Sequence, residues 1–287
     1  MRGHSYSKGK AMPRQPAEVF GHALGETSGQ AVEDRSRYRC PFRNHKCDKQ
    51  SRLIPYPMGV CSVHYGDRII AVCPRRFLQD SIVFQHIADH YFGTQSDLVV
   101  FQELSLSPVG TFDYVMVHHK PLSSDVVDFV MIEFQTGQTT GTGGLVKGLE
   151  DFLQGEEMAG KDYRFGLNLA DIWKRSFTQI LNKGVVLERW GHKIYWIVQE
   201  PVYQNLVDRY NLRDMTYHPN HSTIFMIYDI RQKAEGYELF QTRIESSTID
   251  DLFSAFRHNP HIPPKDAFIQ KLQRRLKAKM ELKIQLG

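Results

Sequence analysis

The sequence predicts a mixed α/β (α+β) protein with a core in the order helix, three strands, helix, strand, preceded by a cysteine-bearing N-terminal segment. Two observations predict the core: three strand-like segments joined by short turns lie between residues 97 and 135, and segments with helical apolar spacing flank them. The third observation is that every cysteine lies between residues 40 and 73. With 287 residues and 41% hydrophobic content, the chain can bury one large core with a small appendage.

The first core helix is expected at residues 75–93. Phe77, Ile82 and Ile87 recur there at helical spacing, and Gly93 supplies a stop signal. Three strands are expected to follow, each rich in β-branched and aromatic residues, at 97–106, 111–119 and 126–135. Because only a few turn residues separate them, these strands should form an antiparallel meander.

A glycine-rich loop and a polar stretch are expected to lead from the third strand to a long helix. This helix should cover residues 170–191, where Gly184 could interrupt it. A strand at 192–199 completes the core, and further strands near 222–230 and 237–244 decorate it.

Two helices are expected at the C-terminus. Thr248 and Asp251 stand at the spacing of a capping box and begin the first of them. Phe268, Leu272 and Leu276 line one face of a basic terminal helix.

Charge is distributed unevenly along the chain, whose net charge is +4. Residues 1–78 hold 14 Lys and Arg against 6 Asp and Glu, and residues 265–287 hold 7 against 2, so the centre is acidic. Basic flanks favour a polyanionic partner, although solvated basic ends are the alternative. Lys174 and Arg175 of the long helix could likewise contact phosphates or face solvent.

Membrane and export signals are not evident in the sequence. No segment approaches the roughly 18 consecutive apolar residues of a spanning helix, and the first residues lack the apolar centre of a signal peptide. We therefore expect a cytoplasmic protein.

Four clustered cysteines in a chain without an export signal favour a metal site over disulfides. They are Cys40, Cys47, Cys61 and Cys73. Thiolates select zinc or iron, and His45 or His64 could replace one sulfur; buried, unrelated thiols are the alternative. We expect a metal-binding module at residues 1–74 and the α/β core at 75–287.

An unusual carboxylate and amide interrupt the apolar third strand. Glu133 and Gln135 face the same side of that strand, and Asp113 can approach the same face if the second and third strands pair. Paired carboxylates suit Mg²⁺, which can activate a water for phosphodiester hydrolysis. The pattern is similar to that of the PD-(D/E)xK nuclease superfamily, except that Gln135 replaces the lysine. A neutral amide can orient a water but cannot supply positive charge.

The chain resembles the NotI-type restriction endonucleases, through ordered landmarks between residue 17 and about residue 190. These are "FGH" (20–22), "CPF" (40–42), "GVCSV" (59–63), "VCPRRF" (72–77), "FQE" (101–103), "FD" (112–113), "IEFQT" (132–136) and "WKRSFTQ" (173–179), and "STIDDLF" continues the similarity. The resemblance implies a PD-(D/E)xQ active site with Asp113 and Glu133 as metal ligands. It also implies a catalytic-site role for Gln135, a nearby acid at Glu103, and iron, or alternatively zinc, on the four cysteines.

The resulting hypothesis is a bacterial, cytoplasmic type II restriction endonuclease. Such an enzyme would cleave both strands of double-stranded DNA at a short palindrome, which the resemblance suggests is GC-rich. It would act as a homodimer with Mg²⁺, beside a cognate DNA methyltransferase. The alternatives are a non-catalytic DNA-binding protein with a degenerate nuclease core and a structure-specific repair nuclease.

Overall fold

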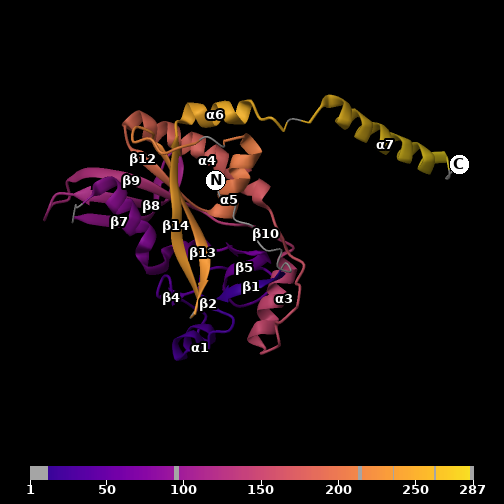
Figure 1. The fold of residues 1–287 in the computed structure, drawn as a ribbon, viewed down its shortest axis with the longest axis horizontal. Helices are drawn as coiled ribbons and strands as arrows, with labels where there is room; N and C mark the ends of the chain where they lie inside the picture. Colours follow the sequence, from indigo (N-terminus) through magenta and orange to yellow (C-terminus); the bar gives the residue numbers. More distant parts are fainter. Residues whose placement is uncertain (1–11, 94–96, 213–214, 235, 262, 285–287) are drawn as a thin grey trace, which may run out of the picture.

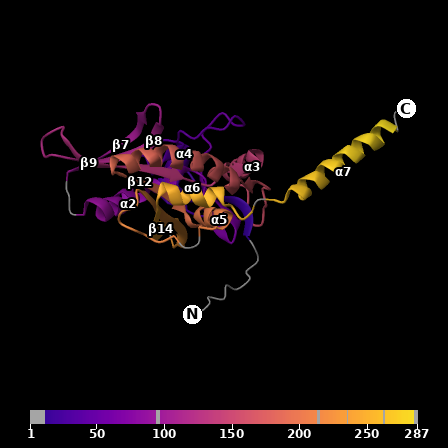
Figure 2. The same cartoon turned by 90° about the horizontal axis from the view of Figure 1, so that it is seen from above.

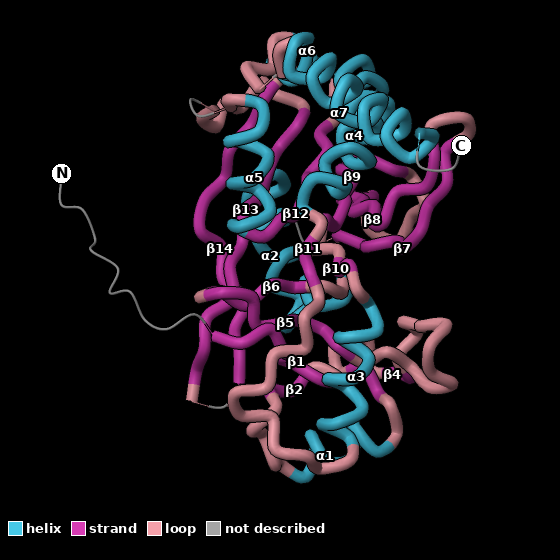
Figure 3. The backbone as a smooth tube through the Cα atoms, turned by 90° about the vertical axis from the view of Figure 1, so that its right-hand side faces the viewer, coloured by secondary structure: helices cyan, strands magenta, loops and turns pink. Residues whose placement is uncertain are grey.

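The computed structural model describes residues 12–93, 97–212, 215–234, 236–261 and 263–284, and these form a mixed α/β structure (Figure 1). A larger part is built on an extended sheet flanked by helices, and a smaller part contains the N-terminal strands (Figure 3). The predicted mixed α/β class is therefore confirmed. Within these described ranges, no helix has both the length and the apolar character needed to cross a membrane.

The largest sheet among the described strands has the order β14-β13-β12-β9-β8-β7. Its members are β7 (Leu98–Leu106), β8 (Gly110–His119), β9 (Val126–Gln135), β12 (Lys193–Gln199), β13 (Thr223–Lys233) and β14 (Gly236–Ser247). Strands β7, β8 and β9 pair antiparallel in sequence order, which confirms the predicted meander. Strand β12 runs parallel to β9, because a long helix returns the chain to the same end of the sheet.

Helices cover both faces of this sheet. One face packs against α4 (Leu169–Trp190), α5 (Glu200–Tyr210) and α6 (Ile249–Arg257), and Trp173 and Trp196 are buried in that core. The opposite face packs against the segment that contains α2 (Ile82–Ile87) (Figure 2). The capping prediction is confirmed, because the Thr248 side chain accepts a hydrogen bond from the Asp251 amide at 3.1 Å.

The expected helix at residues 75–93 is instead three short pieces, so that prediction is wrong. They are a 3₁₀ segment η1 (Pro74–Ser81), α2, and a π-helical turn η2 (Ala88–Phe92). The break has a tertiary cause: the Gln79 side chain hydrogen-bonds the backbones of Tyr237 and Leu239 at 3.2 and 2.8 Å. Asp80 and Ser81 turn the chain with φ of 51° and 55°.

Glycine-rich residues that we expected to form a loop form α3 (Thr142–Leu153) instead. A β-carbon at Gly144 would lie 2.0 Å from the Tyr163 carbonyl oxygen, so glycine permits close packing of this helix. Gly184, the expected interruption, lies inside a continuous α4 for a similar reason. A β-carbon there would lie 2.2 Å from Ile249 Cδ1 of α6.

The smaller part contains a second sheet, whose described strands follow the order β2-β1-β5-β6. They are β1 (Met12–Val19), β2 (His22–Ala23), β5 (Val60–Gly66) and β6 (Arg68–Ala71). Nearby lie α1 (Gly29–Ser36) and the short pairs β3 (Arg39–Cys40) with β4 (His45–Lys46) and β10 (Thr139–Thr140) with β11 (Gly166–Leu167). Helix α3 packs against this sheet and shares its core (Figure 3).

Buried polar contacts join the two sheets. The Arg76 guanidinium, which is fully buried, donates to Glu18 Oε2 at 2.7 Å and to the Tyr237 carbonyl oxygen at 3.0 Å. Gln199, at the end of β12, accepts from the Ala71 amide at 2.8 Å and donates to the Ile69 carbonyl. These contacts fix the N-terminal part on the larger sheet.

The terminal helix α7 (Lys265–Ile284) extends away from the rest of the protein (Figures 1 and 2). Phe268, Leu272 and Leu276 are exposed on it, as are basic residues of the same helix.

Candidate active site

A polar pocket of about 240 Å³ lies between α4 and the strands β8 and β9. Its lining combines the three residues that the sequence singled out with residues of one helix. The lining residues are Thr111, Asp113, Glu133, Phe134, Gln135, Thr136, Gln138, Ile172, Arg175, Ser176, Gln179 and Lys183.

Strand pairing brings the two carboxylates together. Tyr114 of β8 is opposite Ile132 of β9, so Asp113 lies beside Glu133. Asp113 Oδ2 accepts a hydrogen bond from the Phe134 amide at 2.8 Å, which ties this carboxylate to the neighbouring strand. Side chains alternate along a strand, so Asp113 and Glu133 face the side of the sheet that α4 covers.

Gln135 is held by a side chain of α4. The Ser176 hydroxyl, which is buried, donates to Gln135 Oε1 at 2.7 Å. This contact fixes the side-chain amide of Gln135, which lines the pocket and whose NH₂ group can donate a hydrogen bond. The exposed Arg175 lies at the rim, whereas Lys174 lines a different cavity beside Phe256.

Lys183, like Ser176, is a site residue that sequence reasoning missed. It is only 3% exposed, and its Nζ lies 2.5 Å from Glu133 Oε1 and 2.7 Å from the Thr111 carbonyl oxygen. One signal was available in the sequence: Lys183 lies between Ile180 and Leu187 on the apolar face of the long helix. A lysine at such a position needs a buried partner.

Burial governs the electrostatics of the pocket. It raises the pKa of Glu133 to about 7, the negative charge of Asp113 adds to the increase, and Lys183 opposes it. The pKa of Asp113 is also raised, chiefly by burial, while the Phe134 amide and Lys183 act in the opposite direction. Two buried carboxylates that repel each other favour binding of a cation between them.

The donor set of the pocket fits Mg²⁺. This ion takes one or two carboxylates and keeps waters that a phosphate can displace. No cluster of three or more His, Cys, Asp or Glu side chains with metal-site spacing occurs in the described part of the chain. Asp113 and Glu133 supply a pair of carboxylates, which is the number such a magnesium site uses.

Glu103 lies at the edge of this arrangement. Its neighbours Gln102 and Leu104 pair with Tyr114 and Phe112, so Glu103 lies opposite Asp113 across β7 and β8. Its side chain is 65% exposed, lies 3.6 Å from the Arg75 guanidinium, and does not line the pocket.

The four cysteines converge on one enclosed cavity, which Phe20, Lys49 and Arg75 also line. Burial raises the pKa of the Cys40 thiol to about 11 and raises the pKa of Cys47 and Cys61 as well. Four thiols around one cavity are a soft donor set that suits zinc or iron. Among the described residues, however, no group of three or more His, Cys, Asp or Glu side chains is placed so that it could hold a metal ion.

Neither histidine considered as a substitute ligand lines the cysteine cavity. His45 is exposed and contacts the carbonyl of its neighbour, Lys46. His64 lies 3.3 Å from the hydroxyl of Tyr237.

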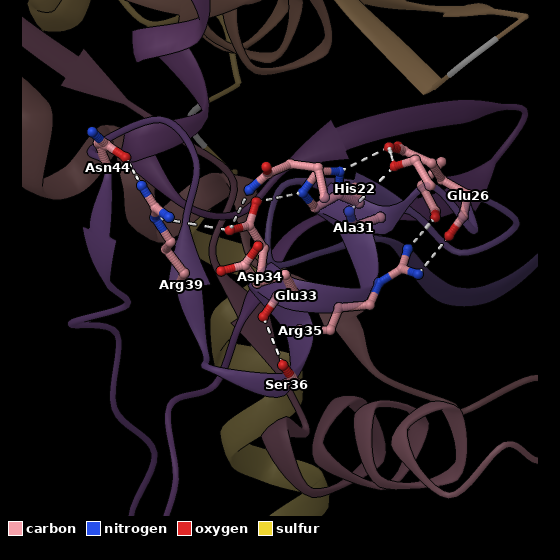
Figure 4. Close-up of polar contacts among 12 residues, drawn as sticks. His22, Glu26, Ala31, Glu33, Asp34, Arg35, Ser36, Arg39 and Asn44 are labelled. Carbon is pink, nitrogen blue, oxygen red and sulfur yellow. Dashed lines mark hydrogen bonds and ion pairs between the residues drawn. The ribbon is translucent and has the colours of Figure 1, made fainter.

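A polar network supports the chain that leads into Cys40 (Figure 4). The His22 ring lies between Glu26 and Asp34, with nitrogen to oxygen distances of 3.0 and 2.9 Å. Arg35 donates to the carbonyl oxygens of Ala23 and Glu26 at 2.6 Å. These contacts fix α1 against the β2 turn and position the cysteine segment that follows.

A larger pocket, of about 650 Å³, lies between the N-terminal sheet and the β13–β14 hairpin. Among the described residues that line this pocket, Glu26 is the one with a carboxylate. That carboxylate already contacts His22 and Ser28. Because this pocket lacks paired carboxylates among those residues, the smaller pocket is the better candidate for catalysis.

Comparison with protein families gives a match that spans both features. The family model described as "Restriction endonuclease NotI" matches residues 18–241, which include the four cysteines and the polar pocket. Comparison with curated proteins gives no match.

Proposed function

Because the chain belongs to the NotI restriction endonuclease family, we propose that it is a type II restriction endonuclease that cleaves both strands of DNA at a short, GC-rich palindrome. The family supports a nuclease that binds DNA. The pocket formed by Asp113, Glu133 and Gln135 carries the proposal, because it combines paired carboxylates with a fixed amide.

In this proposal Asp113 and Glu133 hold Mg²⁺, which when bound would supply positive charge for the scissile phosphate and an activated water. Gln135 orients the attacking water through its NH₂ group, while Ser176 fixes the amide. Glu103 acts as an accessory acid from outside the pocket. We assign the core, α2 through β12, to a PD-(D/E)xK-like αβββαβ unit, and the element order and strand directions support this.

The four cysteines are proposed to hold structural iron, with zinc as the alternative. Their convergence on one cavity supports this, and a bound cation would favour the thiolates that burial alone disfavours. The module would support a DNA-binding surface in the basic N-terminal part. The basic residues of α7 would add phosphate contacts.

A palindromic target matches a protein with twofold symmetry, so we propose a homodimer with one active site for each strand. An enzyme of this type would act in the bacterial cytoplasm, where a cognate DNA methyltransferase protects the host's own sites.

Digestion of sequenced plasmids with Mg²⁺, followed by mapping of the ends, tests the proposal. We expect discrete fragments from the wild-type protein and none from Glu133→Ala, which should still bind DNA. Asp125→Ala is a matched control, because that carboxylate is exposed and pairs with Lys120 away from the pocket; it should cut normally.

Other outcomes separate the alternatives. No cleavage of any DNA by wild-type protein that binds DNA would support a non-catalytic binder. Cleavage without a defined fragment pattern would support a structure-specific nuclease.

A further inference from the structure

We propose that Lys183 of α4 is the catalytic cation of the site, supplying from the helix the positive charge that Gln135 cannot supply from the strand. The inference rests on the proposed nuclease function. It concerns which side chain faces the scissile phosphate in the pocket.

The first argument is position. Lys183 lines the same pocket as Asp113, Glu133 and Gln135, although it is 50 residues from Glu133 in the sequence. Ser176, which holds Gln135, lies seven residues before Lys183, so both side chains project from one face of α4. The same face of α4 therefore fixes the side-chain amide of Gln135 and carries the positive charge of Lys183.

The second argument is burial. Lysine is among the residues least often buried, and a buried ammonium needs a partner. Glu133 Oε1, the Thr111 carbonyl and the Phe112 ring, whose centroid is 5.0 Å from Nζ, surround the Lys183 ammonium. Arg175 is the other cationic side chain among the described residues that line the pocket, and it is exposed at the rim. Among the described residues that line the pocket, Lys183 is therefore the cationic side chain that is buried.

The third argument is hydrogen-bonding capacity. An ammonium has three N–H donors, and Glu133 and Thr111 account for two of them. The third is available for a non-bridging oxygen of the scissile phosphate. Glu133 would in this way hold Lys183 in place with one oxygen and keep the other for the metal ion.

Lys183 transfers no proton in the chemical step. The attacking water forms a bond to phosphorus and releases a proton to solvent, while the bond between phosphorus and the leaving 3′ oxygen breaks. That oxygen takes a proton from solvent. Charge on the phosphate oxygens rises in the transition state, and a fixed ammonium beside them stabilises it.

Lys193 provides a comparison for a purely structural lysine. Its Nζ donates to the carbonyl oxygens of Pro219 and His221 at 2.5 and 2.9 Å, outside the pocket. Replacing Lys193 should therefore lower stability without changing the chemistry.

The test compares Lys183→Met, which keeps the length of the side chain without its charge, with Lys183→Arg and the control Lys193→Met. Single-turnover cleavage at saturating Mg²⁺ should fall by at least about 100-fold in Lys183→Met. Lys183→Arg should recover part of that loss, and Lys193→Met should stay within about threefold of wild type.

Two further measurements separate catalysis from damage to the fold. Calorimetric titration with Mg²⁺ alone, at a pH high enough to keep Glu133 ionised in both proteins, should show that Lys183→Met binds the ion no more weakly than wild type, because a competing positive charge has been removed. Binding of DNA in the presence of Ca²⁺ should be retained.

The inference is overturned if Lys183→Met cleaves as fast as wild type. It is also overturned if its loss of rate comes with weakened Mg²⁺ binding, because that result identifies a structural role. Absence of cleavage by the wild-type protein would instead reject the proposed function itself.

Discussion

The stability of the metal-free protein should depend on pH through Glu133. Burial raises the pKa of this carboxyl from its ordinary 4.5 to about 7 in the folded protein. Between these values the folded protein binds the proton more tightly than the unfolded chain does. Stability from this group is therefore present at low pH and is lost as pH rises through 7.

The size of the effect follows from the two pKa values. The difference between 4.5 and about 7 corresponds to about 3 kcal/mol of unfolding free energy, lost between pH 5 and pH 8. Glu133→Gln removes the titration. A glutamine cannot ionise, so the free energy of unfolding of this variant should not follow the pH slope of wild type, although its ion pair with Lys183 at high pH is lost.

Urea unfolding at pH 5, 6, 7 and 8 in the presence of a chelator measures this difference. The wild-type curve should fall relative to that of Glu133→Gln by about 3 kcal/mol over the range, and Mg²⁺ at pH 8 should restore stability to the wild type alone. Asp125→Asn, at an exposed carboxylate, should run parallel to wild type. Parallel curves for wild type and Glu133→Gln would refute the reasoning.

Three further predictions concern the framework of the site. Gly144→Ala should lower the free energy of unfolding by about 2 kcal/mol or more, since its β-carbon would meet the Tyr163 carbonyl at 2.0 Å; urea unfolding measures this, and an unchanged midpoint contradicts it. Arg76→Met should cost about 3–5 kcal/mol by leaving Glu18 buried without its partner, and a loss below about 1 kcal/mol would show that water reaches Glu18. Elemental analysis should find about one iron or zinc per wild-type chain and much less in Cys61→Ser, and equal metal in both proteins would place the ion elsewhere.

Local patterns in the sequence were sufficient for the meander and for the face that the acids share. Short turns restrict the pairing of β7, β8 and β9, and strand alternation orients Glu133 and Gln135 together. Both inferences use only residues near each other in the chain, and for that reason they could be made without the structure.

The errors arose where distant segments decide the local conformation. The helix expected at residues 75–93 is broken because Gln79 binds the backbone of Tyr237, far along the chain. The glycines of α3 resemble those of a loop until Tyr163 is seen to pack against Gly144. Lys183 was missed because a lysine on a long helix is usually solvated, and only the docking of α4 on the sheet shows its partners.

The contact between Gly184 and Ile249 connects the C-terminal region to the proposed active site. Because residue 184 has no side chain, α6 packs directly against α4 next to the residue that carries the buried ammonium. Packing of α6 therefore supports the backbone of α4 beside Lys183. On the proposed role of Lys183, substitutions in α6 that change this packing should alter the cleavage rate without contacting DNA or metal.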